Sequence, residues 1–477
     1  MRFNTKTKTK TLTYNLAGGQ AHGQTSKVEF ASILLTSFMM DQFYRSATDT
    51  MVRMFELMDS IEDKRFIAQT AIFARNQFGM RSVTHATAAY IAKAVKGERW
   101  TKSFFEKVVH RPDDMTEILS LYFTLFGNPK RSKHGGEVPS AVRKGFGMAL
   151  QRLTEYQLAK YQAKTASVSL VDVINMVHPP GNDRIGALID GTLPPAETWE
   201  VRLTKAGQEA TSESDKARLK EEAWTSLIRE RKLGYFALLR NLRNISTQAP
   251  AVLDEALEML CDPSLVRKSL VLPFRFTTAY DIMRENRKIA VALNKALEVS
   301  MANVPRFAGR TLVVLDVSGS MNGRPADIGS LFAAVLVKSS DADMMVFSDR
   351  ARYVPYNPLD SVTTIRDSFR FAAGGTNFHA IFRTIDKPYD RIILLSDMQG
   401  WVEHRLPRQV FVDYKRRMGA DPFIYSFDLQ GYGTTQFNPK DPKVLCLAGF
   451  SDKVLDLMAL LESDKNAMLH EIEKVEL

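Results

Sequence analysis

The segment Asp316-Val-Ser318-Gly-Ser320 places one carboxylate and two hydroxyl groups at alternate positions. It follows Thr311–Leu315, a continuous apolar run rich in β-branched residues, which predicts a central strand of a parallel sheet. Ligands of open α/β sheets bind at the carboxyl ends of the strands, so these oxygen atoms lie where a ligand is expected. Short oxygen-bearing side chains suit Mg²⁺, Mn²⁺ or Ca²⁺ rather than zinc. We therefore predict a site for a hard divalent cation, with Mg²⁺ as the first choice.

Two later segments bring further oxygen atoms to the same sheet edge. Ala373-Gly-Gly-Thr376-Asn377 is a glycine turn that presents a threonine hydroxyl. Arg391–Leu395 predicts a second buried strand, and Ser396-Asp397 follows it. On its own, Asp-x-Ser-x-Ser is more typical of a turn in which Asp or Ser caps the next helix. The combination favours the cation, and the predicted ligands are Asp316, Ser318, Ser320, Thr376 and Asp397.

The elements that must position these residues divide the chain in two. Asp343–Phe347 predicts a third strand, and strands alternating with amphipathic helices indicate a doubly wound α/β sheet. From about residue 28 to 300, apolar residues recur at helical spacing, which predicts an all-α solenoid of stacked helix pairs. We interpret Pro180–Lys220 as a mobile insertion. A chain of 477 residues is too long for one core. The predicted division is a basic arm at 1–27, a helical domain at 28–305 and an α/β domain at 306–477.

The charge follows the same division. Residues 301–477 hold 21 Lys and Arg against 22 Asp and Glu, which leaves 43 against 32 in residues 1–300. The excess positive charge is therefore confined to the amino-terminal part, as expected of a module that binds a polyanion. A basic balance also fits many solvated surfaces.

The two cysteines, Cys261 and Cys446, cannot form a disulfide framework, and each lies in an apolar context where a small buried residue is expected. The first residues lack the apolar core of a secretory signal, and no apolar stretch approaches the ~18 residues needed to span a bilayer. We expect a cytoplasmic protein without membrane contact.

Residues from about 309 to 477 resemble a von Willebrand factor A domain, whose metal-ion-dependent adhesion site uses Asp-x-Ser-x-Ser, Thr and Asp in this order. The resemblance implies that Ser318, Ser320 and Thr376 supply hydroxyl oxygens, while Asp316 and Asp397 bind the ion directly or through water. It also implies one coordination position for an outside group, commonly an acidic side chain of a partner. No nucleophile with an adjacent base is evident, so we expect a binding protein and not an enzyme.

Several other segments are similar to the Ro autoantigen family, in which a TROVE module precedes an A domain. They occur in the family's order and cover nearly the whole chain: Asn15-Leu-Ala-Gly-Gly19, Leu158–Lys164, Leu170–Pro179, Ala237–Leu242, Leu272–Phe276, Asp413–Met418 and Leu447–Phe450. The resemblance implies a ring or horseshoe of HEAT-like helices closed by the A domain. It also implies binding of small noncoding, Y-like RNA and of single-stranded 3′ ends of misfolded RNA. We expect an exonuclease or another acidic protein as a further partner.

The resemblance places RNA contacts at Lys160, Lys164 and His178. Lys160 and Lys164 are four residues apart, so on a helix they share one face and can meet successive phosphates. An ordinary solvated face for this pair and a helix-end role for His178 are the alternatives. Further candidates are basic residues around turns and a glycine-bearing loop: Arg75, Arg81, His85, Lys130, Arg131, Lys133, His134, Arg143, Lys144, Arg240 and Arg243.

Three classes of function remain open from the sequence. The first is an RNA-binding scaffold in RNA quality control or processing, and the second is an adaptor that docks an acidic partner through the metal site. A nuclease ranks lowest, because a single site with hydroxyl ligands lacks the clustered carboxylates of two-metal chemistry. A closed ring needs no second subunit, so we expect a monomer.

Overall fold

The structure is a computed structural model. It describes residues 12–37, 45–127, 138–161, 167–194, 198–269, 271, 273–301, 304, 307–371, 374–403, 405–447, 458 and 466–477. These residues form two compact units. One, the sheet unit, comprises residues 1–83 and 303–476, and the other, the helical unit, comprises residues 84–302 with the last residue. The sheet unit therefore contains the first helices of the chain as well as the carboxyl-terminal segment.

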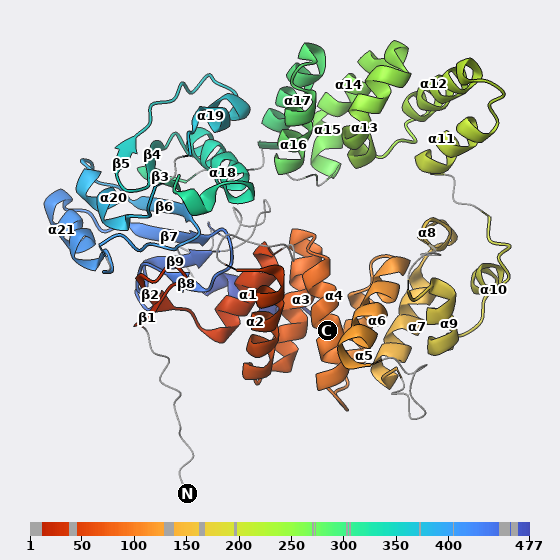
Figure 1. Ribbon diagram of the computed structural model, residues 1–477, viewed down its shortest axis with the longest axis horizontal. Coiled ribbons are helices and arrows are strands. Elements are labelled where there is room, and N and C mark those ends of the chain that lie inside the picture. The colour runs from red at the N-terminus through yellow and green to blue at the C-terminus, as the bar shows by residue number, and fades with distance from the viewer. Residues whose placement is uncertain are drawn as a thin grey trace, which may run out of the picture. The chain divides into compact units, whose positions relative to one another are not determined.

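The sheet unit is built on a six-stranded sheet with the order β5-β4-β3-β6-β7-β9 (Figure 1). Its strands are β3 (Thr311–Asp316), β4 (Asp343–Phe347), β5 (Ala351–Tyr353), β6 (Arg391–Ser396), β7 (Phe423–Asp428) and β9 (Val444–Leu447). All neighbours pair in parallel except β5, which runs antiparallel to β4 at the edge. Every residue of β3 and β6 is buried, as the apolar runs predict. The prediction of a doubly wound α/β sheet is confirmed.

Helices cover both faces of this sheet (Figure 1). They include α18 (Arg324–Ser340), α20 (Phe378–Thr384) and α21 (Arg408–Met418), and α19 (Val362–Ser368) lies beside α18. Near the end of the chain, α23 (Ala467–Glu473) packs on α3 (Lys64–Phe78). One face packs Val314, Phe347 and Leu394 against Phe382 and Tyr414 of α20 and α21, forming a continuous core. Helix α18 packs on β3, β4 and β6 and against α19.

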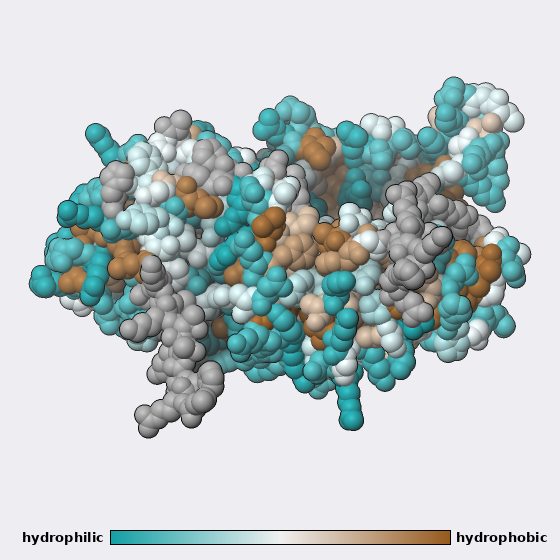
Figure 2. All heavy atoms as spheres, turned by 60° about the horizontal axis from the view of Figure 1, so that its bottom comes forward, coloured by the Kyte–Doolittle hydropathy of each residue, from teal (hydrophilic) through white to brown (hydrophobic). Residues whose placement is uncertain are grey.

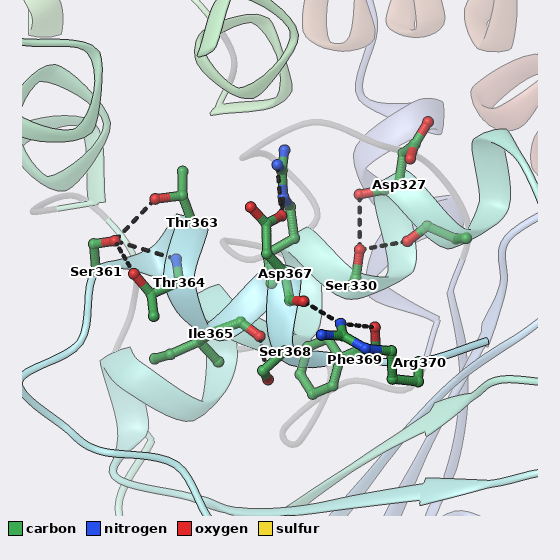
Figure 3. Close-up of polar contacts among 12 residues, drawn as sticks. Asp327, Ser330, Ser361, Thr363, Thr364, Ile365, Asp367, Ser368, Phe369 and Arg370 are labelled. Carbon is green, nitrogen blue, oxygen red and sulfur yellow. Dashed lines mark hydrogen bonds and ion pairs between the residues drawn. The ribbon is translucent and has the colours of Figure 1, made fainter. Parts of the chain in front are cut away.

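Side-chain hydrogen bonds define both ends of the short helix α19. Ser361 accepts a hydrogen bond from the backbone N–H of Thr364 at 3.1 Å and so caps α19 (Figure 3). At the other end, Ser368 donates from its hydroxyl to the carbonyl of Ile365. These bonds satisfy backbone groups that a helix terminus leaves without partners.

The amino-terminal segment adds a second, three-stranded sheet to the sheet unit. Strands β1 (Leu12–Tyr14) and β2 (Gln20–Gly23) form an antiparallel hairpin, and β2 pairs with β8 (Thr434–Thr435). Helices α1 (Ser26–Thr36), α2 (Ala47–Ser60) and α3 (Lys64–Phe78) follow. Residues 1–11 lie outside the described residues, but residues 12–23 are not an arm. The expectation of a basic arm is wrong for that part, because backbone pairing ties it to a strand far along the chain.

The helical unit is all-α, as predicted. Its helices are α4 (Ser82–Ala94), α5 (Thr101–Lys107), α6 (Pro112–Phe126), α7 (Ser140–Arg152), α8 (Glu155–Lys160), α9 (Leu170–Val177), α10 (Asp183–Ile189), α11 (Trp199–Gln208), α12 (Glu213–Arg229), α13 (Tyr235–Gln248), α14 (Leu253–Cys261), α15 (Pro263–Ser269), α16 (Pro273–Met283) and α17 (Arg287–Ser300). Most pack on helices close to them in sequence, for example α5 on α7, α11 on α12 and α16 on α17. Helices α10 to α12 occupy most of Pro180–Lys220, so the expectation of a mobile insertion there is wrong.

The surface of the face shown in Figure 2 is mostly hydrophilic, with apolar residues in separate patches. This agrees with helices that each bury one apolar stripe and expose a polar one. Among the described residues, no helix combines the length and the apolar character needed to cross a membrane.

Candidate functional site

The predicted cation ligands lie at the carboxyl edge of the six-stranded sheet. Asp316 ends β3, and Ser318 and Ser320 follow in a tight turn that includes a 3₁₀ helix at Gly319–Met321. Asp397 comes directly after β6. Their side chains, together with that of Thr376, are between 0% and 4% exposed. The predicted cation-binding side chains are thus buried at one edge of the sheet. This is the carboxyl edge, where open α/β sheets bind their ligands.

Hydrogen bonds join the three loops that carry these residues. The Asp316 carboxylate accepts from the Ser318 N–H at 2.9 Å and from the Ser396 hydroxyl at 2.6 Å, which links the first loop to the end of β6. The Gly319 N–H donates to the carbonyl of Gly374 at 3.2 Å, which links it to the glycine turn. The Thr376 carbonyl in turn accepts from the N–H of Trp401, in the loop that follows Asp397.

The electrostatics of this edge are unfavourable in the absence of a cation. Burial raises the pKa of Asp397, and the neighbouring charge of Asp316 raises it further. Burial also raises the pKa of Asp316. One carboxylate oxygen of Asp397, Oδ2, is buried without a hydrogen-bond partner. Two buried acids, hydroxyl groups and an orphaned oxygen fit a hard cation, which would satisfy the oxygen and offset the repulsion.

The donor set also limits the kind of metal. In the described part of the chain, no group of three or more His, Cys, Asp or Glu side chains could hold a metal ion. An ion at this edge would therefore depend on two carboxylates and neutral hydroxyls, which suits Mg²⁺, Mn²⁺ or Ca²⁺ better than Zn²⁺ or Cu²⁺, which favour imidazole or thiolate ligands.

The amino-terminal glycine segment packs against the loop that follows Asp397. The Asn15 side-chain amide donates to the Gly400 carbonyl at 2.7 Å, and the Leu16 N–H donates to the Gln399 side-chain oxygen at 2.7 Å. Gly19 lies so close that a Cβ atom there would collide with the Gly400 carbonyl oxygen. Sequence reasoning missed this role, since about 380 residues separate the two segments and the hydrogen bonds form only in the folded chain.

A second site lies in the helical unit, where several predicted RNA-contacting residues line one pocket of about 480 Å³. Arg143 and Lys144 come from α7, and His178 follows α9. Lys102 of α5 also lines it and was missed by the sequence reasoning. Gly145 of α7 allows α7 to pack closely on α5, because a Cβ atom at this position would lie 2.5 Å from the Lys102 carbonyl oxygen. We call this the α7 pocket.

The turn after α9 is held in an uncommon conformation that places His178 on the α7 pocket. His178 adopts a left-handed backbone with φ of 52°, and its N–H donates to the Ile174 carbonyl at 2.9 Å. The Gln151 side chain of α7 donates to the Pro180 carbonyl at 2.7 Å, which ties the turn to α7. The histidine side chain is exposed while its backbone is fixed. His178 therefore ends α9 through its backbone and also lines the α7 pocket.

Two family models cover almost all of these elements. The TROVE domain matches residues 20–188 and 190–322, and the Ro60 vWA domain matches residues 310–461. The chain belongs to the Ro60 family. This confirms the resemblance noted from the sequence, with the helical module before the A domain.

Named relatives of this Ro60-family chain are distant. It is 24% identical over 358 residues to the RNA-binding protein RO60 of Deinococcus radiodurans, a match that covers 63% of this chain and 66% of that protein. It is 22% identical over 246 residues to the RNA-binding protein RO60 of Caenorhabditis elegans, covering 46% and 38%. The matches thus span less than two thirds of either relative. The crystal structure of the Deinococcus radiodurans RO (RSR) protein superposes with a TM-score of 0.60 at 18% identity, over 94% of this chain and 99% of that one.

The other predicted RNA contacts of this Ro60-family chain have different surroundings. His85 is only 1% exposed, with its Nε2 atom 3.0 Å from a carboxylate oxygen of Asp114 and its Nδ1 atom 2.9 Å from one of Glu117. A ring enclosed in this way has no surface to offer RNA, which corrects that expectation. Arg75 and Arg81 are half-buried. Lys130, Arg131, Lys133, His134 and Lys164 lie outside the described residues.

Lys160 lies among aromatic rings at the end of α8. Its ammonium is 5.6 Å from the ring centre of Tyr156 and 5.5 Å from that of Tyr161, and the Arg111 guanidinium is 4.1 Å from the Tyr161 ring. Burial alone would lower the pKa of Lys160, but the two tyrosines and Glu200 outweigh it and raise the pKa. Lys160 therefore stays charged beside stacking surfaces.

Proposed function

We propose that this chain binds RNA through its helical unit, with the α7 pocket as a principal contact. The observation that carries the proposal is the convergence of Lys102, Arg143, Lys144 and His178 on one pocket. Lys102 and Lys144 are exposed and form no ion pair within the described part of the chain. Cations that converge without carboxylates among the lining residues favour a phosphate backbone as ligand.

The chemistry of the α7 pocket favours single-stranded RNA over duplex. Gly147, Met148 and Pro179 give it an apolar wall beside the cations, and the His178 ring is available for stacking or for hydrogen bonds to a base. Two relatives are named as RNA-binding proteins, which supports the same class of ligand. We infer that the ligands are single-stranded 3′ ends of noncoding RNA and small Y-like RNA, bound by a scaffold and not by an enzyme.

The test compares an RNA hairpin carrying a single-stranded 3′ tail with the same hairpin without the tail, by fluorescence anisotropy over a salt series. We expect tail-dependent binding that weakens steeply with salt and is reduced in Lys102→Ala/Lys144→Ala. The matched control is Lys96→Ala/Lys205→Ala, which removes the same charge from exposed positions outside the pocket. Equal binding by both double variants would contradict a specific role for the α7 pocket.

We further propose that Asp316, Ser318, Ser320, Thr376 and Asp397 hold a divalent cation, with Mg²⁺ first. The supporting observation is the buried Asp397 oxygen without a hydrogen-bond partner. When bound, the ion supplies positive charge at the edge where two carboxylates are enclosed. Ser396 and the Ser318 backbone hold Asp316 in place, and the Gly319 to Gly374 bond holds the glycine turn beside it.

The alternative function, a metal-dependent adaptor for an acidic partner, makes a different prediction from RNA binding. RNA affinity should be unaffected by EDTA and by Asp316→Ala at constant ionic strength, since the α7 pocket belongs to the helical unit. Loss of all binding activity on chelation would favour the adaptor. All five ligands are buried in this conformation, which favours an ion that stabilises the loops over one that binds an outside carboxylate.

A further inference from the structure

A second pocket of the helical unit, of about 420 Å³, lies between α13 and α16. Its side chains include Phe236, Arg240 and Arg243 from α13 and Arg275, Thr278 and Ile282 from α16. We call it the α13–α16 pocket. Its volume falls within the range of ordinary small-ligand sites. Sequence reasoning named the two α13 arginines as RNA contacts and gave no role to Phe236 or to the residues of α16.

The amphipathic pattern of α13 explains why this face is left on the surface. Leu238, Leu239, Leu242 and Ile245 are buried in the helical unit. Phe236, Arg240 and Arg243 recur on the other side at spacings of three and four residues, so they share an exposed face. Helix α16 is held nearby through the buried Phe276, whose ring centre lies 6.2 Å from that of Tyr235. The pocket is thus fixed by core packing on both helices.

Three guanidinium groups meet in this pocket without a carboxylate among its lining residues. Burial lowers the pKa of Arg275, and the positive charge of Arg240 lowers it further, so the two cations repel each other. Arginines retain their charge, and such a cluster is favourable when an anion with several oxygen atoms binds between them. A phosphate group meets that requirement.

The pocket also offers an exposed aromatic surface. Phe236 is 41% exposed, and the guanidinium carbons of Arg240 and Arg275 lie 5.8 Å and 5.6 Å from its ring centre. The neighbouring Ile282 is 61% exposed. A flat aromatic ring beside arginines is the arrangement with which proteins hold single-stranded nucleic acids, because bases stack on the ring and phosphates bind the cations.

We propose that the α13–α16 pocket binds a nucleotide unit of single-stranded RNA, with a base stacked on Phe236 and a phosphate between Arg240, Arg243 and Arg275. This inference rests on the proposed function, because it assigns a second contact point on the same class of ligand. An acidic or phosphorylated protein segment would use the arginines but has no need of the exposed ring.

The experiment measures fluorescence anisotropy of the full chain with a labelled single-stranded oligouridine and with an abasic oligomer of the same length, which keeps the phosphates and lacks the bases. We expect Phe236→Leu, which retains apolar volume, to weaken oligouridine binding roughly 5- to 100-fold and to leave abasic binding unchanged. Arg240→Ala/Arg243→Ala should weaken binding of both. The control is Arg267→Ala/Lys268→Ala, which removes the same charge outside the pocket.

The outcomes separate this inference from the proposed function. Wild-type binding of oligouridine that Phe236→Leu leaves intact would overturn the stacking site while RNA binding stands. Equal loss for both oligomers in Phe236→Leu, with an unchanged thermal melt, would also overturn it, since the ring would then not recognise bases. If the wild type binds no RNA, both proposals fail. Competition by an acidic phosphopeptide that depends on the arginines and not on Phe236 would overturn the assignment in favour of a protein ligand.

Discussion

The carboxyl edge of the six-stranded sheet and the two basic pockets of the helical unit have opposite arrangements of charge. At the sheet edge, two acids are buried and one carboxylate oxygen has no hydrogen-bond partner. In the helical unit, cations are exposed around pockets whose lining residues include no acid. A small cation inside the fold would stabilise the first arrangement, and an anion bound at the surface would stabilise the second. Changes that affect one region should therefore leave the other unchanged.

The largest effect is expected from Gly19→Ala. The added Cβ would collide with the Gly400 carbonyl oxygen, and overpacking against backbone is poorly relieved. We expect a loss of about 3 kcal/mol in the free energy of unfolding of the sheet unit. Chemical denaturation followed by tryptophan fluorescence measures it, with Gly18→Ala as a neighbouring comparison: its Cβ would meet no atom within 4 Å, but its φ of 82° makes alanine unfavourable by about 1 kcal/mol. A loss in Gly19→Ala no larger than that in Gly18→Ala would contradict the expected collision with Gly400.

The next effect is expected from metal binding. A ligand at 100 times its Kd stabilises the folded state by about 2.7 kcal/mol. We expect Mg²⁺ to raise the melting temperature of the wild-type chain and to have no effect on Asp397→Asn, which keeps the shape and removes the charge. In EDTA the variant should be at least as stable as the wild type, because a buried acid has been removed. A full Mg²⁺ response in the variant would exclude Asp397 as a ligand.

A smaller effect is expected from Lys144→Ala on RNA affinity. Loss of one charge-assisted phosphate contact should cost about 1 kcal/mol, and the slope of log K against log salt should fall by roughly 0.7 for a single strand. Anisotropy at several salt concentrations measures both quantities. The response of the melting temperature to Mg²⁺ should not change, and a change in it would contradict the independence of the two regions.

The smallest effect on stability is expected from His178→Gly, and it has the opposite sign to the effect on binding. Because His178 has a positive φ of 52°, glycine should fit its backbone with less strain, raising stability by about 0.5 kcal/mol. RNA affinity should fall, since the ring at the α7 pocket is lost. Thermal melts and anisotropy on the same preparation distinguish this result from a purely structural role, in which affinity would not change.

The sequence alone was sufficient to predict those elements that are encoded by a pattern of neighbouring residues. Strands β3, β4 and β6 are continuous apolar runs, and each was predicted within one residue of its observed bounds. The predicted cation ligands other than Thr376 lie at the ends of β3 and β6 or directly after them. The start of α12 was also locally encoded and was misinterpreted: Ser212 accepts from the Asp215 N–H, so the polar run is a helix cap and not a mobile insertion.

Features that depend on distant partners could not be predicted. The burial of His85 depends on Asp114 and Glu117, on another helix. Lys102 reaches the α7 pocket only because Gly145 brings α5 close to α7. The β2 to β8 pairing joins His22 with Thr435, and neither short segment carries a recognisable strand pattern. In each case the residue type is ordinary, and its role is created by tertiary packing.

The contact between Asn15 and Gly400 has a consequence for how the chain is made. The sheet unit is discontinuous, because its first part ends near residue 83 and its second begins near residue 303, whereas the helical unit is one continuous stretch. Contacts that close such long loops form slowly. We expect the helical unit to acquire its structure during synthesis, while the amino-terminal hairpin waits for β8 to leave the ribosome. Limited proteolysis of arrested chains ending near residue 330 would show a protected helical segment beside a cleavable amino terminus.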